Sequence, residues 1–144
     1  MKRLLLGVIP ALAGMALAHA YLVSSSPPEN ARLEAPPTEV RLGFTEAVVL
    51  PFSLFRVYRL EAPGNPRQAA EALAARVLAR REDPPGRVDL GLKTQGRSAE
   101  NVVLALEPGL RPGVYVVVWR VLSVDTHVTS GFYLFTYQPP GGRP

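Results

Sequence analysis

The sequence contains no cysteine, and this absence excludes whole classes of chemistry. Disulfides, thiolate metal sites, iron–sulfur clusters and cysteine nucleophiles are all ruled out. A strong charge of one sign is lacking too, because 16 Lys and Arg stand against 12 Asp and Glu in 144 residues. With 15 Pro and 12 Gly, long uninterrupted helices are not expected. These numbers favour a single all-β domain with many turns over a disordered chain.

Long hydrophobic runs are also scarce, and the longest one lies at the start of the chain. Lys2 and Arg3 precede an apolar run over residues 4–17, and small residues follow it. We predict a cleaved secretory signal peptide over residues 1–18, with cleavage before His19. The alternative is an uncleaved membrane anchor, which the run disfavours because its roughly 14 residues fall short of the ~20 needed to cross a bilayer.

Cleavage would change the composition of what remains. Both methionines, Met1 and Met15, lie in the predicted signal peptide, so residues 19–144 contain no sulfur. The remaining 14 basic and 12 acidic residues are nearly balanced, and no basic cluster with interleaved aromatic residues is present. Nucleic acid is therefore not an expected partner. No second apolar run is long enough to insert stably in a membrane.

Alternating apolar and polar residues predict the fold. Val40, Leu42 and Phe44 alternate with more polar neighbours, which is the period-2 pattern of a half-buried strand. About seven such strands at short spacing predict an immunoglobulin-like Greek-key β-sandwich over residues 19–138, followed by a flexible tail over residues 139–144. The expected strands cover residues 21–25, 40–45, 52–60, 88–92, 102–106, 114–124 and 132–137.

The strand expected over residues 114–124 carries two further signals. It is apolar on nearly every position, which indicates burial on both faces and a central place in its sheet. Tyr115 follows a Pro112-Gly113 turn, as in the tyrosine corner of immunoglobulin-like sandwiches. An ordinary aromatic core residue is the other interpretation of Tyr115.

Residues 65–83 do not fit a β-sandwich and predict a short helical insertion. Asn65 is a suitable helix cap, Pro66 suits the first helical position, and Leu73 and Val77 form an i,i+4 apolar pair. We expect a surface helix whose apolar stripe packs on the sandwich. A helix that binds a partner protein is the alternative.

The two histidines point to a metal site. Cleavage before His19 would leave a histidine whose α-amine and imidazole can chelate one ion. The second histidine, His127, follows Asp125 by two residues in the expected loop between the last two strands. On an extended segment, residues i and i+2 share one face, so both side chains could bind one ion. The first strand begins at the end of the sandwich where the penultimate strand finishes, which places this loop beside His19.

The chemistry of this donor set favours copper. Three nitrogens and one carboxylate oxygen suit tetragonal Cu(II), and we expect one ion per chain. Zinc would accept the same ligands in tetrahedral geometry. Cu(I) prefers thioether or thiolate ligands, which residues 19–144 do not contain.

Three stretches carry a further signal, and they are residues 19–27, 36–46 and 115–127, the last followed by Ser130-Gly131. Together they resemble the CopC family of periplasmic copper-binding proteins. The resemblance covers most of residues 19–144 except the helical insertion. It implies an immunoglobulin-like sandwich that binds Cu(II) through His19, Asp125 and His127. Glu46 is interpreted as a residue that orients or hydrogen-bonds the α-amine, with an ordinary solvated carboxylate as the alternative, and Trp119 as a core residue.

One departure from the family limits what the resemblance implies. Some CopC proteins carry a methionine-rich loop that binds Cu(I), whereas residues 65–83 contain neither Met nor His. A second copper site is therefore not expected.

The sequence predicts an exported, periplasmic Cu(II)-binding protein, not an enzyme, that sequesters or carries copper for homeostasis or resistance. Delivery to an inner-membrane copper transport protein is implied by the resemblance alone. The first alternative is a copper-dependent monooxygenase-like enzyme with an N-terminal histidine chelate, which Asp125 disfavours because an anionic ligand stabilises Cu(II). A metal-free adhesion or assembly module is the second alternative.

Overall fold

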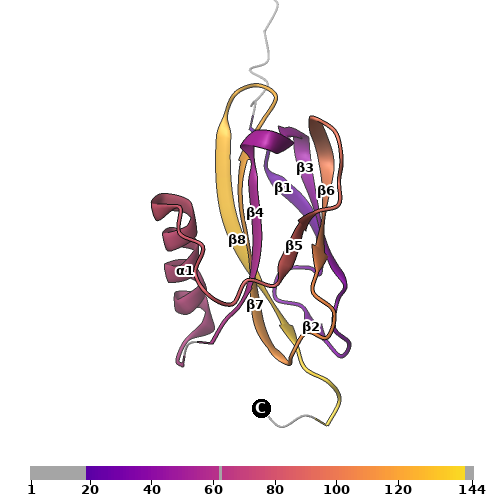
Figure 1. Ribbon diagram of the computed structural model, residues 1–144, viewed down its shortest axis with the longest axis vertical. Coiled ribbons are helices and arrows are strands. Elements are labelled where there is room, and N and C mark those ends of the chain that lie inside the picture. Colours follow the sequence, from indigo (N-terminus) through magenta and orange to yellow (C-terminus); the bar gives the residue numbers. More distant parts are fainter. Residues whose placement is uncertain (1–18, 62, 142–144) are drawn as a thin grey trace, which may run out of the picture.

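The computed structural model describes residues 19–61 and 63–141, which form two packed four-stranded sheets and one α-helix (Figure 1). The strand orders are β1-β3-β6-β5 and β2-β8-β7-β4. The predicted signal peptide, residues 1–18, lies outside the described residues. The elements are β1 (Leu22–Ser26), β2 (Arg32–Leu33), β3 (Glu39–Val49), a 3-10 turn (Leu50–Phe52), β4 (Leu54–Arg59), α1 (Pro66–Arg80), β5 (Asp89–Leu92), β6 (Ser98–Leu106), β7 (Gly113–Leu122) and β8 (Val128–Tyr137).

This arrangement confirms the expected β-sandwich with one helical insertion. All seven expected strands are present, with shifted ends. The strand expected from Phe52 begins at Leu54, because Pro51 lies in the 3-10 turn and has no N–H to donate to a sheet. β2 was not expected, since its two residues, which pair in parallel with β8, are too short for a periodic pattern.

β7 occupies the centre of its sheet, between β8 and β4, as its composition predicted. Val117 and Val121 face the main core between the two sheets, and both are fully buried. Val116 and Val118 point to the opposite face and are equally buried, because α1 covers them. β7 therefore needs apolar residues at nearly every position, because both of its faces are covered.

The tyrosine corner is confirmed at the start of β7. The Tyr115 hydroxyl donates a hydrogen bond to the backbone carbonyl of Arg111, four residues upstream. Its ring stacks on Phe135 of β8, with ring centroids 5.2 Å apart. The corner fixes the turn into β7 and with it the direction in which β7 runs toward the opposite end of the sandwich.

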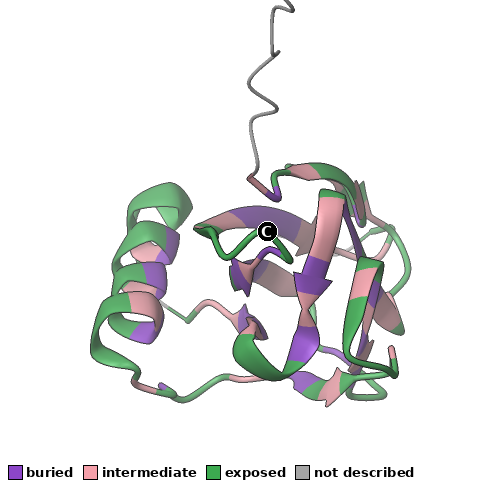
Figure 2. Cartoon of the chain, turned by 90° about the horizontal axis from the view of Figure 1, so that it is seen from above, coloured by how far each residue is buried: buried purple, intermediate pink, exposed green. Residues whose placement is uncertain are grey.

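α1 packs on the outer face of the sheet that contains β7. The Asn65 side chain accepts hydrogen bonds from the Arg67 and Gln68 amides and caps the helix. The helix ends at Arg80, earlier than the expected residue 83, because Arg81 adopts a left-handed conformation with φ of 54°. Its buried residues face the sandwich and its exposed residues face away (Figure 2), as expected for a surface helix; they are Ala70, Ala74 and Val77.

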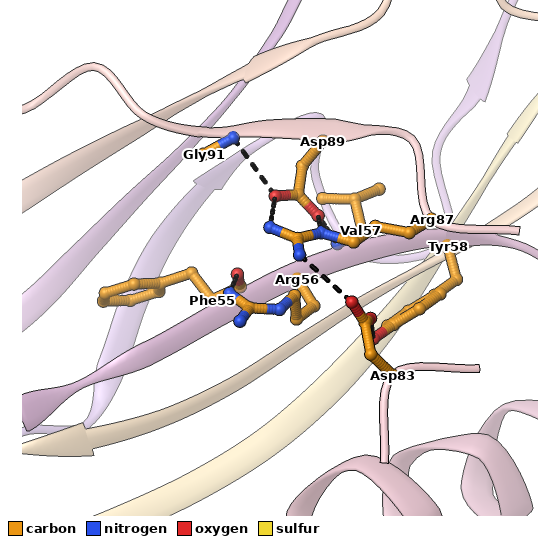
Figure 3. A network of polar contacts seen from close by, with 8 residues as sticks. All are labelled: Phe55, Arg56, Val57, Tyr58, Asp83, Arg87, Asp89 and Gly91. Carbon is orange, nitrogen blue, oxygen red and sulfur yellow. Dashed lines mark hydrogen bonds and ion pairs between the residues drawn. The ribbon is translucent and has the colours of Figure 1, made fainter. Parts of the chain in front are cut away.

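A network of polar side chains ties the segment after α1 to β4 and β5 (Figure 3). The Tyr58 hydroxyl donates to Asp83 Oδ1 at 2.6 Å. Arg87 contacts Asp83 at 3.2 Å and forms a two-point ion pair with Asp89, whose side chain is fully buried. Asp89 also accepts a hydrogen bond from the Val57 amide of β4 at 2.9 Å. This network fixes the position of the segment that follows α1 relative to both sheets, because β4 and β5 belong to different sheets.

The pKa of Asp83 makes part of this stabilisation dependent on pH. The hydrogen bond from Tyr58 lowers this pKa, partial burial opposes the shift, and Arg87 lowers the pKa further. Because the pKa is lower in the folded state, the stabilisation is complete above the ordinary carboxyl pKa of about 4 and is lost as the pH falls through the folded value. We expect Asp83→Asn to lower the free energy of unfolding near neutral pH by about 1 kcal/mol or less, since Asp83 is half exposed.

Urea unfolding of the wild type and of Asp83→Asn at about pH 7 and about pH 3 measures this effect. The difference between the two proteins should shrink at the lower pH. A difference of equal size at both pH values would show that the variant acts through packing and not through charge.

Candidate metal centre

The backbone around His19 is held in place by two threonines. The Thr45 hydroxyl of β3 donates a hydrogen bond to the His19 carbonyl at 2.9 Å. The oxygen of this hydroxyl also accepts a hydrogen bond from the Tyr21 amide at 2.9 Å. The Thr129 hydroxyl of β8 donates to the Ala20 carbonyl at 2.6 Å. Ala20 itself is buried in the main core. The position of residue 19 is therefore set by contacts with both sheets.

The connection between β7 and β8 is a compact turn. The Ser123 amide donates to the His127 carbonyl at 2.8 Å, and the Thr126 amide donates to the Ser123 carbonyl at 2.9 Å. Thr126 has a φ of 72°, in the left-handed region. The expectation that residues 125–127 form an extended segment is thus wrong. The left-handed conformation of Thr126 sets the directions of the Asp125 and His127 side chains, and the alternation of a β-strand does not apply to them. Nothing in the sequence around Thr126 signals this conformation.

An irregularity in β3 brings Glu46 to the same place. The pairing of β3 with β6 shifts register between Gly43 and Val48. Beyond the shift, Val48 bridges to Ser123, and the Ala47 carbonyl accepts from the Val124 amide at 3.1 Å. Bulged strands change the direction of a side chain relative to its sheet. The end of β3 therefore lies between the start of the described chain and the β7–β8 turn.

The two histidines lie against each other. The ring centroids of His19 and His127 are 4.7 Å apart, in an edge-to-face arrangement with an interplanar angle of 70°. The Tyr21 ring also lies beside His19, at 5.7 Å between ring centroids. His127 and Asp125 are exposed, and His19 is half-buried. The expected neighbourhood of residue 19 and the last loop is therefore present, although the two segments are far apart in sequence.

Two carboxyl groups face each other at this position. One oxygen of Glu46, Oε2, is buried and receives no hydrogen bond from the residues that the structure describes. Burial raises the pKa of Glu46, and the neighbouring Asp125 carboxyl raises it further, whereas His19 and His127 oppose the shift. Two adjacent carboxylates repel each other, so this arrangement favours a shared proton or a bound cation.

The side chains as they stand do not yet form a complete set of ligands. Within residues 19–61 and 63–141, no three His, Asp or Glu side chains are spaced to hold a metal ion. The fourth expected donor, the α-amine of His19, is created only by cleavage, because Ala18 precedes His19 in the chain. Sequence reasoning missed Thr45 and Thr129, since no pattern distinguishes a threonine that anchors a backbone from the other threonines of a strand.

The fold is thus that of an immunoglobulin-like β-sandwich protein, with two sheets, a tyrosine corner and a polar end where two histidines and two carboxyl groups gather. In the described part of the chain, no helix is both long and apolar enough to cross a membrane. The family model of the CopC domain matches residues 22–138. The chain belongs to the CopC family, and its functional class is copper binding and copper homeostasis.

Individual relatives agree with this assignment. Copper resistance protein C from Escherichia coli is 31% identical over 130 residues, which cover 90% of each chain. Copper transport protein CutJ from Bacillus subtilis (strain 168) is 29% identical over 121 residues, which cover 83% of this chain and 18% of CutJ. The crystal structure of CopC from Methylosinus trichosporium OB3b aligns with a TM-score of 0.63 and 27% identity, over 88% of this chain and 100% of that one.

Proposed function

We propose that the processed protein begins at His19 and binds one Cu(II) ion through His19, Asp125 and His127. His19 supplies its α-amine and its imidazole, and the other two residues supply a carboxylate oxygen and an imidazole. The observation that carries the proposal is the contact between the two histidine rings, 4.7 Å apart, beside the Glu46–Asp125 pair.

The donor set supports Cu(II) over other ions. Three nitrogens and one oxygen suit tetragonal coordination, and copper has the highest affinity among divalent first-row metals for such ligands. Residues 19–144 contain no sulfur, which disfavours Cu(I). Glu46 orients or hydrogen-bonds the α-amine, and a cation beside it offsets the repulsion between Glu46 and Asp125.

Binding of this kind depends on pH. The α-amine must lose a proton, and its reference pKa is about 7.7–8.0. Both imidazoles must be neutral as well, so copper uptake releases protons and weakens in acid.

The physiological role follows from export. After removal of residues 1–18, the protein sequesters or carries Cu(II) in the periplasm, as part of copper homeostasis or resistance. Delivery to an inner-membrane copper transport protein is supported by CutJ, a copper transport protein in which the similar segment makes up 18% of the length. Because the exposed β7–β8 turn supplies two of the ligands, the ion would lie where another protein can reach it.

Titration with Cu(II) of protein whose first residue is His19 tests the proposal. We expect one ion per chain, and His127→Ala and Asp125→Ala each to weaken the affinity by more than about 100-fold, since outer-sphere partners alone change metal affinity by about 10–100-fold. Quenching of the single Trp119 and competition with a chelator measure the affinity.

A matched control variant is Glu107→Ala. Glu107 is an exposed carboxylate in the connection between β6 and β7, outside the metal centre. This variant should bind copper as the wild type does, and all four proteins should have the same far-UV circular dichroism. Wild-type copper affinity in His127→Ala would refute the proposed ligand set.

A second candidate function, a copper-dependent monooxygenase-like enzyme, is favoured by the pairing of an N-terminal histidine with a second histidine. Asp125 disfavours it, because an anionic ligand stabilises Cu(II) and hinders reduction. Oxygen consumption and peroxide formation by the copper-loaded protein with a reductant would support the enzyme. Copper binding without oxygen consumption would support a copper carrier. Absence of stoichiometric copper uptake would support the metal-free adhesion or assembly module.

A further inference from the structure

α1 covers only part of the outer face of its sheet. The helix packs on Tyr58 of β4, Val116 and Val118 of β7, and Leu134 of β8. All three strands continue past the end of the helix toward the β7–β8 turn, at the top of Figure 1. Among residues 19–61 and 63–141, no other element covers the sheet face beyond the helix.

This uncovered face forms a groove with a volume of about 420 Å³. Its floor comes from β4, β7 and β8, including Leu54, Leu122 and Val128. The end of α1 with residues 81–83 lines one part of the groove, and the 3-10 turn with Phe52 lines another. Phe52 and Val128 both line the groove and are 73% and 52% exposed, and exposed apolar side chains gathered in one groove are typical of a binding surface.

The groove carries an excess of positive charge. Arg56, Arg81 and Arg120 line it, and none of them forms an ion pair with a carboxylate among the residues that the structure describes. The groove also contains two acidic residues, but each of these already has a cationic partner. Glu82 pairs with Arg76 at 2.8 Å and Asp83 pairs with Arg87 at 3.2 Å.

The groove adjoins the metal centre. Val128, which lines the groove, directly follows His127 in the chain. The Leu122 amide donates a hydrogen bond to Ser53 Oγ at 3.1 Å, and this bond connects the segment before β4 to the end of β7 that enters the turn. A molecule bound in the groove would therefore lie beside the β7–β8 turn that carries Asp125 and His127.

We propose that this groove docks an acidic segment of the protein that exchanges copper with this chain, a segment that also carries large apolar side chains. Guanidinium groups bind carboxylates with two parallel hydrogen bonds, and the apolar floor accepts side chains between them. Because the groove is concave and alternates apolar and cationic side chains, it should bind an extended peptide more readily than the flat surface of a lipid bilayer. The exchange of copper rests on the proposed function, whereas the docking of an acidic segment does not.

Fluorescence anisotropy of a labelled synthetic peptide tests the docking on metal-free protein at low salt. The probe is an acetylated and amidated peptide of alternating glutamate and leucine, and its control replaces each glutamate by glutamine. Only the acidic peptide should bind, and Arg81→Gln/Arg120→Gln should weaken its binding by about tenfold or more. Both arginines are exposed and make no ion pair with any carboxylate in the described part of the chain, so this variant should fold normally.

The matched control is Arg32→Gln/Arg97→Gln, which changes the net charge equally but lies outside the groove. It should bind the acidic peptide as the wild type does. Equal loss in both double variants, equal binding of the neutral peptide, or no loss in Arg81→Gln/Arg120→Gln would overturn the proposal. Binding of phosphatidylglycerol vesicles in place of the peptide, with the same arginine dependence, would identify a membrane surface and would also overturn it.

The two proposals fail separately. His127→Ala should bind the acidic peptide with wild-type affinity, because His127 does not line the groove. Arg81→Gln/Arg120→Gln should in turn bind Cu(II) as the wild type does. Normal peptide binding without copper uptake would refute the proposed function alone, and normal copper uptake without peptide binding would refute the docking alone.

Discussion

Adding a single residue before His19 is expected to weaken Cu(II) binding by about a thousandfold or more. The addition converts the α-amine into a peptide nitrogen and opens the chelate ring that the amine and the imidazole form together. The His19 residue then offers one strong donor in place of two. The resulting loss of copper affinity should exceed the roughly 10–100-fold loss that follows removal of an outer-sphere partner. The fold should be unaffected, because the contacts that fix this part of the chain are made by the His19 and Ala20 carbonyls.

The two forms can be compared directly. Both are released from the same fusion, and mass spectrometry verifies that one begins at His19 and the other one residue earlier. Competition with a copper chelator then gives the ratio of affinities. A third form, extended by one residue at Pro144, controls for length and should bind as tightly as the first. Equal affinities in all three would remove the α-amine from the copper site.

The strands and the surroundings of the site could be predicted for different physical reasons. β7 was predictable because burial on both faces leaves an apolar run, here with Val116 and Val118 under α1 and Val117 and Val121 in the main core. The proximity of residue 19 to the last loop followed from topology alone, because it requires only the order and direction of the strands.

Local backbone conformations at the site could not be predicted in the same way. The left-handed φ of Thr126 arises from the hydrogen bonds of the β7–β8 turn, and threonine does not favour this conformation intrinsically. The register shift of β3 that positions Glu46 is accompanied by a bridge between Val48 and Ser123, which are 75 positions apart in the sequence. β2 has only two residues and exists because β8 offers it an edge. Each of these features is decided by distant contacts, which a local sequence pattern does not contain.

Asp89→Ala is expected to lower the free energy of unfolding by about 3 kcal/mol, the typical cost of removing one partner from a buried ion pair. The Asp89 side chain is fully buried and accepts hydrogen bonds from the Val57 and Gly91 amides as well as from Arg87. Its removal would leave a buried backbone amide of β4 without an acceptor. It would also leave Arg87 with only the weaker, half-exposed partner Asp83.

Urea unfolding measures the loss, and two variants show where it comes from. Asp125→Ala removes an exposed carboxylate from the metal centre and should not destabilise the metal-free protein, because the carboxylate that it removes repels Glu46. Arg87→Ala/Asp89→Ala should be less destabilised than the sum of its two single variants, because the double variant removes both members of the pair. A loss below about 1 kcal/mol in Asp89→Ala would mean that the network contributes no more than surface ion pairs do. In that case the helix would be held on the sheet mainly by packing of Ala70, Ala74 and Val77, together with the Tyr58–Asp83 hydrogen bond.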